Sequence, residues 1–152
     1  MSKRVVIIGG GASGLMAAVR AARCGAAVTV LEANEKPGKK LLATGNGRCN
    51  LTNLTQERGC YRGGDWAFTE KILEQFPVSA AISFFSSLGI YTKNRNGWIY
   101  PNSDQASSVL QVLLLEAASR KVKLKTREKV VSVKKKDSFF VTETDTWHYE
   151  SD

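Results

Sequence analysis

The sequence contains few of the residues that build metal and disulfide centres. Its 152 residues include three cysteines and one histidine, and no two cysteines form a Cys-x-x-Cys motif. Zinc binding and dithiol redox chemistry therefore have no support, and we expect no metal site. Because small secreted domains are usually rich in paired cysteines, we expect a cytoplasmic protein whose thiols stay reduced.

Long apolar runs are missing as well. No stretch approaches the ~20 consecutive apolar residues of a membrane span, and the apolar run near the N-terminus is too short for a signal peptide. Hydrophobic residues still make up 43% of the chain, which excludes a disordered protein and suffices for a folded core. We therefore expect a globular domain without a membrane partner.

Acidic residues are scarce in one segment near the C-terminus. The net charge is +8, and Arg120–Lys136 contains nine basic residues beside a single acid, Glu128, so this segment alone matches the net charge. Its lysines alternate with apolar residues, which is typical of a solvated strand face. We therefore expect no nucleic-acid partner, although a basic nucleic-acid-binding module stays open as an alternative.

The first 32 residues have the pattern of a βαβ unit. Val5–Ile8 is a continuous apolar run, as in a strand buried on both faces. Leu15–Arg23 is rich in alanine and is followed by Gly25, which is typical of a helix and its C-terminal cap. Val28–Leu31 then predicts a second strand, which ends at Glu32.

The middle of the chain begins with a polar, glycine-bearing segment, Glu35–Gly64, in which no element is predicted; a loop this long is usually functional. Three helices are predicted after it, at Trp66–Phe76, Val78–Leu88 and Asp104–Ser119, with a short strand at Trp98–Tyr100.

The last third predicts a strand at Val122–Lys125 and then three strands joined by tight turns, at Val131–Lys134, Phe139–Thr142 and Trp147–Tyr149. The predicted fold class is α/β: a Rossmann-like βαβ domain followed by an antiparallel β-meander. Because only three candidate parallel strands are present, the sheet is incomplete. We therefore expect the sequence to be the N-terminal part of a longer chain.

A Gly9-x-Gly11-x-x-Gly14 fingerprint lies between the first strand and the first helix. In this context Gly9 permits the tight turn out of the strand, and Gly11 lets the backbone approach a pyrophosphate. Gly14 lets the helix pack closely on the sheet. A glycine-rich turn without a ligand is the alternative interpretation.

The fingerprint predicts a dinucleotide site. Unpaired N–H groups at the helix N-terminus, at Ala12 and Ser13, can bind phosphate, and Glu32 can accept hydrogen bonds from ribose hydroxyls. Because the charge of Glu32 disfavours a 2′-phosphate, the pattern favours FAD or NAD over NADP. An NAD-binding Rossmann dehydrogenase therefore stays open as an alternative to a flavoprotein.

Residues 38–53, with the sequence GKKLLATGNGRCNLTN, resemble the signature of one flavoprotein family. It is the HI0933-like group, also called the BaiN or aminoacetone-oxidase type of FAD-binding oxidoreductases. Three later motifs agree with this resemblance: Phe84-Phe85-x-x-Leu88-Gly89, Gly97-x-x-Tyr100-Pro101-x-Ser103 and Ala106–Val109.

The resemblance implies a glutathione-reductase-like, three-layer FAD domain, with an inserted second domain and a C-terminal FAD-binding segment that lie outside this sequence. It implies flavin-mediated hydride or electron transfer on a small-molecule substrate, with NAD(P)H as a plausible reductant. We expect an enzyme in the intact protein and an inactive fragment in these residues alone. Substrate, catalytic residues and oligomeric state are not predicted.

The resemblance also assigns further cofactor-binding residues. Lys39 and Lys40 are expected near the pyrophosphate or the ribityl chain, and the backbone at Val130 near the adenine. The glycine-rich loop around Gly47 can bring its backbone close to a ligand, Arg48 adds positive charge, and Asn50 offers an amide to the flavin. An ordinary solvated loop is the alternative.

The remaining thiols and the histidine are expected to be structural or incidental. We predict Cys49 as a buried structural thiol, Cys24 as a core residue at the end of the first helix, and Cys60 as a loop thiol. His148, the only histidine, is predicted as an exposed strand residue.

Overall fold

The computed structural model describes residues 2–152, which divide into two units. The first unit comprises the chain up to Leu41 together with Leu110–Asp152, and the second comprises Leu42–Val109. No helix in the described residues is long and apolar enough to cross a membrane.

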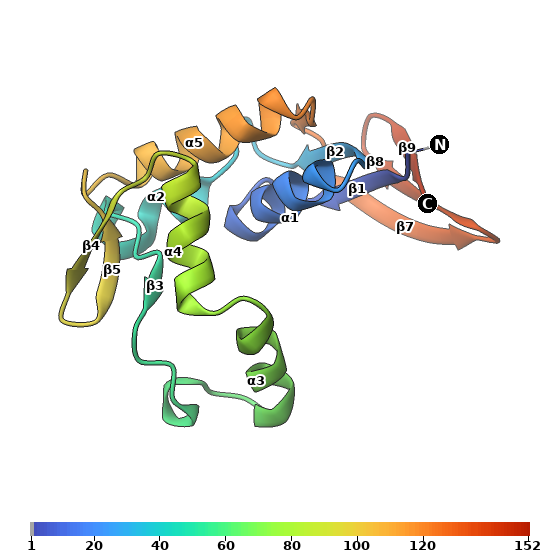
Figure 1. Ribbon diagram of the computed structural model, residues 1–152. Helices are drawn as coiled ribbons and strands as arrows, with labels where there is room; N and C mark the ends of the chain where they lie inside the picture. Colours follow the sequence, from blue (N-terminus) through green and yellow to red (C-terminus); the bar gives the residue numbers. More distant parts are fainter. Residues whose placement is uncertain (1) are drawn as a thin grey trace. The chain divides into compact units, whose positions relative to one another are not determined.

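A parallel sheet forms the centre of the first unit (Figure 1). It contains β1 (Arg4–Ile8), β2 (Ala27–Glu32) and β6 (Lys123–Thr126) in the order β1-β2-β6. The three parallel strands predicted from the sequence are therefore confirmed. The first is half-buried rather than buried on both faces: Ile8 is 56% exposed, because β1 is an edge strand of this three-stranded sheet.

Helix α1 (Ala12–Arg23) covers one face of this sheet. Its Ala18 is fully buried against Val28 and Val30 of β2, and Ile7 and Leu124 pack against the same cluster. The small alanine side chain lets the helix approach the strands closely, which explains the alanine-rich sequence of the helix.

The β-meander completes the first unit with β7 (Val130–Lys136), β8 (Phe139–Thr144) and β9 (His148–Ser151). The strands are antiparallel in the order β7-β8-β9, as predicted. The meander residues Trp147 and Tyr149 line, with Thr29 of β2, a cavity of about 810 Å³. Side chains alternate along a strand, so Thr29 lies on the face of the sheet opposite to Val28 and Val30, which contact α1. Helix, sheet and meander therefore form successive layers.

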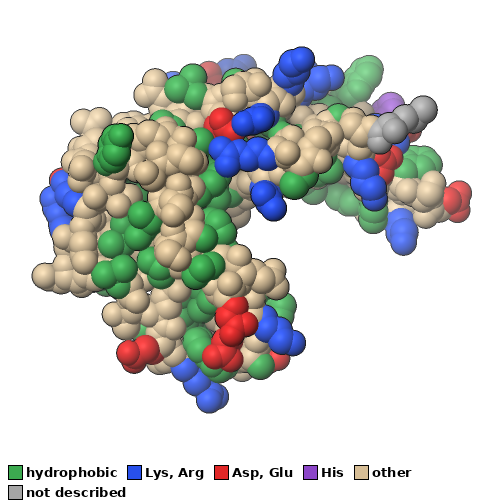
Figure 2. Space-filling model, in the orientation of Figure 1, with side chains coloured by type: hydrophobic (Ala, Val, Ile, Leu, Met, Phe, Trp, Pro, Cys, Tyr) green, Lys and Arg blue, Asp and Glu red, His purple; other side chains and the backbone are tan. Residues whose placement is uncertain are grey.

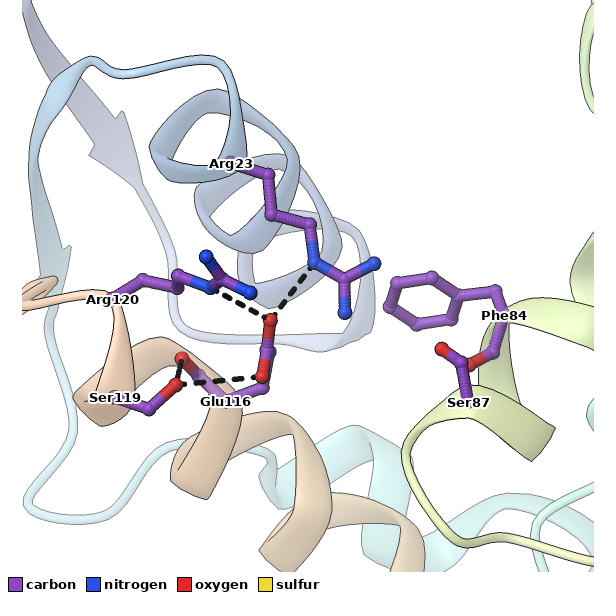
Figure 3. Close-up of polar contacts among 6 residues, drawn as sticks. All are labelled: Arg23, Phe84, Ser87, Glu116, Ser119 and Arg120. Atoms are coloured by element: carbon purple, nitrogen blue, oxygen red, sulfur yellow. Dashed lines mark hydrogen bonds and ion pairs between the residues drawn. The ribbon is translucent and has the colours of Figure 1, made fainter.

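Helix α5 (Ala106–Ser119) begins in the second unit and ends in the first. We predicted its start at Asp104, but that residue has a φ of 53°, which is incompatible with a right-handed helix. Near its end, Glu116 accepts hydrogen bonds from Arg23 Nε of α1 at 2.8 Å and from Arg120 Nε at 3.1 Å (Figure 3). These ion pairs join the last turns of α1 and α5.

The second unit contains short elements around a small antiparallel sheet. In chain order they are α2 (Lys39–Ala43, which begins in the first unit), η1 (Thr44–Gly47), β3 (Thr52–Asn53), η2 (Arg58–Cys60), α3 (Trp66–Gln75), α4 (Val78–Ser87), β4 (Thr92–Arg95) and β5 (Trp98–Pro101). The sheet order is β3-β5-β4. The predicted helices at Trp66 and Val78 and the strand at Trp98 are confirmed.

Two features of the second unit differ from the prediction. The segment Glu35–Gly64 is not free of elements, but each has two to five residues, too few to show a periodic pattern. Strand β4 was not predicted because its sequence is polar. A signal was present nonetheless: Asn96-Gly97, with φ of 52° and 89°, is the two-residue turn that favours a β-hairpin.

The basic segment Arg120–Lys136 is spread over a helix end and strand faces. Lys123 and Lys125 are exposed on β6, and Lys134 pairs with Glu143 across the meander at 3.1 Å. On the face shown in Figure 2, Lys and Arg side chains form small separate groups, with Asp and Glu side chains among them. This distribution agrees with a solvated strand face.

The Glu116 ion pairs predict a pH dependence of stability. The hydrogen bond from Arg23, with a further one from Arg120, holds the pKa of Glu116 below its usual value. A group with a lowered folded-state pKa stabilises the fold above its ordinary pKa, and this contribution is lost as pH falls through the folded value. Glu116→Gln should therefore lower the free energy of unfolding at neutral pH by about 1–2 kcal/mol.

Urea unfolding at about pH 7 and about pH 3 checks this, since the wild type and Glu116→Gln should converge in acid. Glu35→Gln is the matched control, because the Arg127–Glu35 pair is exposed, at 72% and 67% of the side chains, and should contribute nothing measurable. Equal stability of the two variants at neutral pH would contradict the prediction.

Candidate cofactor-binding site

Two of the three fingerprint glycines are required by the fold itself. Gly9 has a φ of 98°, and its N–H donates to the Leu31 carbonyl at 2.7 Å. A Cβ at Gly14 would lie 1.9 Å from the Gly9 carbonyl oxygen, inside the backbone of the turn. Any side chain at Gly14 would therefore push α1 away from β1.

Gly11 is different, because neither its conformation nor its packing requires glycine. It is the N-cap of α1 with φ −81° and ψ −173°, and a Cβ there would have no atom within 4 Å. No side chain caps the helix, and Ala12 and Ser13 are exposed. The N–H groups of the first turn thus face open space, which is the geometry that binds a phosphate.

Glu32 ends β2 and is 8% exposed. Its carboxylate accepts hydrogen bonds from the Gly10 N–H at 2.8 Å, the Asn34 N–H at 2.8 Å and Asn34 Nδ2 at 2.6 Å. Burial alone would raise the pKa of Glu32, but the hydrogen bonds from Asn34 and Gly10 outweigh it and lower the pKa. The carboxylate therefore stays ionised and keeps acceptor capacity for a ligand hydroxyl.

The entry into the meander lies beside Glu32. The Glu128 N–H donates to the Glu32 carbonyl at 2.9 Å, and the Arg127 N–H donates to the Asn34 carbonyl at 3.1 Å. These bonds bring the start of β7 to the carboxyl end of β2, so Val130, half-buried, follows two residues after a direct contact with Glu32. The structure thus brings together two regions that the sequence analysis assigned to one ligand.

Lys39 and Lys40 begin helix α2, and both are exposed. The preceding Gly38 has a φ of 75°, and its N–H donates to the Gly10 carbonyl at 2.9 Å. A Cβ at Gly38 would lie 2.5 Å from Leu110 Cδ1, so this glycine permits a close approach to α5. The hydrogen bond to Gly10 holds Gly38 at the fingerprint turn, and the two lysines follow Gly38 directly in the chain.

The rest of the signature lies in the second unit and forms a tight loop. Asn46, Gly47 and Cys49 have φ of 54°, 81° and 61°, and Gly47 and Arg48 are exposed. Asn50 Nδ2 donates to the carbonyls of Thr52 at 3.0 Å and Ile99 at 3.1 Å. The Asn50 amide therefore holds the loop on β5, and only its oxygen is left for a ligand.

Asp104, which was not predicted as a site residue, lies at the centre of a charge cluster in the second unit. Its Oδ2 accepts from Lys93 Nζ at 2.5 Å and from Arg95 at 2.7 Å. The hydrogen bond from Lys93 and the charges of Arg95 and Arg48 lower the pKa of Asp104. Its position just after the Gly97–Ser103 motif was the only signal in the sequence.

The structure confirms some of the predictions for the cysteines and the histidine and contradicts others. Cys49 is buried as predicted, and burial raises the pKa of its thiol. The prediction of a core position for Cys24 was wrong: it is exposed, because it follows the last turn of α1 as the C-cap. Cys60 is exposed, but it ends the short helix η2 and does not lie in a loop as predicted. His148 is exposed on β9, as predicted.

Comparison with known protein families identifies the family of this chain. The sequence model of the HI0933-like protein Rossmann domain matches residues 3–152. The chain belongs to this family. The resemblance stated from residues 38–53 is therefore confirmed, and so is the Rossmann fold class.

Two of the relatives in the comparison illustrate different named activities. The 3-dehydro-bile acid delta(4,6)-reductase of Clostridium scindens is 48% identical over 98% of this chain and 37% of that protein. The ribosomal RNA dihydrouridine synthase of Escherichia coli is 32% identical over 89% of this chain and 34% of that protein. This HI0933-like chain thus spans little more than a third of either relative.

Solved structures share the fold at low identity. The 3-ketosteroid-delta4-(5alpha)-dehydrogenase from Rhodococcus jostii RHA1 superimposes with a TM-score of 0.63 at 14% identity, over 97% of this chain and 44% of that one. CtdE, solved in complex with FAD and substrate 4, gives 0.58 at 18% identity, over 99% and 36%. These likenesses establish the fold only.

The contrast between Gly14 and Gly11 gives a stability prediction for this HI0933-like domain. Gly14→Ala should lower the free energy of unfolding by about 1–3 kcal/mol, because the new Cβ overlaps the Gly9 carbonyl. Gly11→Ser should leave it unchanged or raise it slightly, because serine is a favourable N-cap residue. Urea unfolding of both variants measures the difference, and equal losses would refute the distinction.

The thiol environments predict selective labelling. Iodoacetamide at mildly alkaline pH should modify Cys24 and Cys60 rapidly in the native protein, because both are exposed. Cys49 should react only in urea, since its buried thiol has a raised pKa and stays protonated. Peptide mass spectrometry reads out each site; modification of Cys49 at the rate of Cys60 would show that it is accessible.

Proposed function

We propose that the intact protein is an FAD-dependent oxidoreductase and that the first unit binds the ADP half of the cofactor. The observation that carries this proposal is the open surroundings of Gly11. A glycine that neither conformation nor packing requires, in front of an uncapped and exposed helix N-terminus, is explained by close approach of a pyrophosphate.

The surrounding residues fit the remainder of that half. The N–H groups of Ala12 and Ser13 would bind the pyrophosphate, and the ionised Glu32 would accept hydrogen bonds from ribose hydroxyls. The backbone at Val130, two residues after the Glu128 N–H that bonds Glu32, would contact the adenine. The exposed Lys39 would add positive charge near the phosphates.

Further contacts are proposed from the family signature. Lys40 would lie near the pyrophosphate or the ribityl chain, and Gly47, Arg48 and Asn50 would contact the flavin. Bound FAD supplies hydride or electron transfer, while the protein binds and orients it. We propose NAD(P)H as the reductant, and a reduction as the reaction, because the 48% identical relative is named a reductase.

The substrate proposed first is a small molecule, in line with the bile acid named for that relative. A second candidate is reduction of a uridine in RNA, which the 32% identical dihydrouridine synthase favours. The open alternative of an NAD-binding dehydrogenase explains the fingerprint and Glu32 but not the family signature.

The absorbance of the purified intact protein tests the cofactor. We expect a flavin spectrum, either as isolated or after addition of FAD. Gly11→Ser should weaken FAD binding at least about tenfold with unchanged folding, and Glu32→Gln should weaken it by a similar factor. Glu35→Gln, an exposed acid three residues on, is the control and should bind FAD normally.

Absence of flavin absorbance after reconstitution would overturn the proposal. Tight NADH binding by such a flavin-free protein would favour the dehydrogenase. With the flavin established, turnover on an unsaturated 3-oxo-steroid and on a uridine-containing RNA separates the two substrate candidates.

A further inference from the structure

The second unit contains a cavity that the proposed cofactor site does not use. Its volume is about 420 Å³, which falls in the range of small-ligand sites. Six of its lining residues have side chains or backbone that could contact a ligand: Arg58, Tyr61, Arg62, Gly63, Gly64 and Trp66. They come from η2, the loop that follows it and the start of α3.

Two guanidinium groups border this cavity without an anionic partner. Within residues 2–152, Arg58 and Arg62 form no ion pair, as is also the case for Arg20 and Arg48. Ion pairs hold the other arginines: Arg4, Arg23, Arg95, Arg120 and Arg127. The neighbouring carboxylate of Asp65 is engaged elsewhere, because it caps α3 by accepting the N–H groups of Ala67 at 2.9 Å and Phe68 at 3.4 Å. The two arginines are therefore available for a phosphate.

An aromatic pair forms another part of the wall. The rings of Tyr61 and Trp66 lie 5.8 Å apart between centroids and are tilted by 49°. Tyr61 is 37% exposed and Trp66 is half-buried, so their rings are held in place yet remain accessible. Such faces stack on flat heteroaromatic rings irrespective of the base.

The glycines leave the remaining wall open. A Cβ at Gly63 or Gly64 would have no atom within 4 Å, so packing requires neither glycine. Gly63 also has a φ of 118°, which only glycine adopts readily. The backbone is thus exposed to a ligand between the arginines and the aromatic pair.

We propose that this cavity binds a nucleoside phosphate, with its base against Tyr61 and Trp66 and its phosphate between Arg58 and Arg62. Aromatic faces and unpaired guanidinium groups in one cavity match the two halves of this ligand. The ADP half of FAD is assigned to the first unit, so this is a separate site and does not depend on flavin binding.

Calorimetric titration of the intact, FAD-saturated protein with 5′-AMP, 5′-UMP, 2′,5′-ADP and a short oligouridine tests the site. We expect saturable binding, accompanied by a fluorescence change that Trp66→Phe abolishes. Arg58→Ala/Arg62→Ala should weaken binding at least about tenfold. Lys71→Ala, which removes an exposed cation from α3 outside the cavity lining, is the matched control and should bind like the wild type.

The ligand series identifies the source of the nucleotide. Tighter binding of 2′,5′-ADP indicates half of a dinucleotide coenzyme, and tighter binding of a short oligouridine indicates a nucleotide within RNA. Either result supports the site.

Three results would overturn it: no binding up to about 10 mM, inorganic phosphate binding as tightly as the nucleotides, or unchanged binding by the correctly folded double-arginine variant. Circular dichroism establishes that the variant is folded. Because the protein is saturated with FAD beforehand, failure at this cavity is distinguishable from failure of the proposed flavin site.

Discussion

The contact between Gly14 and the Gly9 carbonyl fixes where α1 begins and how closely it lies on the sheet. With no Cβ at Gly14, the helix packs Ala18 against Val28 and Val30, and its N-terminus stays open at the carboxyl end of β1. A displaced helix would lose this buried contact and would also turn its N–H groups away from the fingerprint turn. Folding and the anion-binding geometry thus depend on the same close approach.

Glu32 connects the other parts of the candidate site to that turn. Its side chain holds Gly10, and its carbonyl accepts the N–H of Glu128, so the fingerprint turn and the start of the meander meet at the end of β2. Gly10 in turn accepts the N–H of Gly38, which leads into the two lysines. Hydrogen bonds of the backbone and of the Glu32 side chain therefore bring these four segments together, and burial of one ionised carboxylate is offset by the donors around it.

The sequence predicted the parts of the fold that depend on regular patterns. The βαβ unit, the helices and the meander follow from hydrophobic periodicity and turn residues, and the family signature follows from residues 38–53. It could not predict that Asn50 binds the backbone of β5 or that Asp104 gathers Lys93 and Arg95, because these contacts depend on loops whose path no local pattern specifies. Cys24 was misplaced for a related reason: one residue beyond a helix end, the helical face no longer determines burial.

The cations behind the net charge of +8 fall into two groups, those paired with a carboxylate and those without such a partner. In the basic segment Arg120–Lys136, Arg120, Arg127 and Lys134 each face a carboxylate. The lysines around them are exposed, and salt screens their charges. Lys39 and Lys40 instead follow a residue bonded to the fingerprint turn, and Arg58 and Arg62 border an aromatic cavity. We propose that these four cations, which stand beside backbone or aromatic surface, bind anionic ligands, and that the segment with most of the net charge does not.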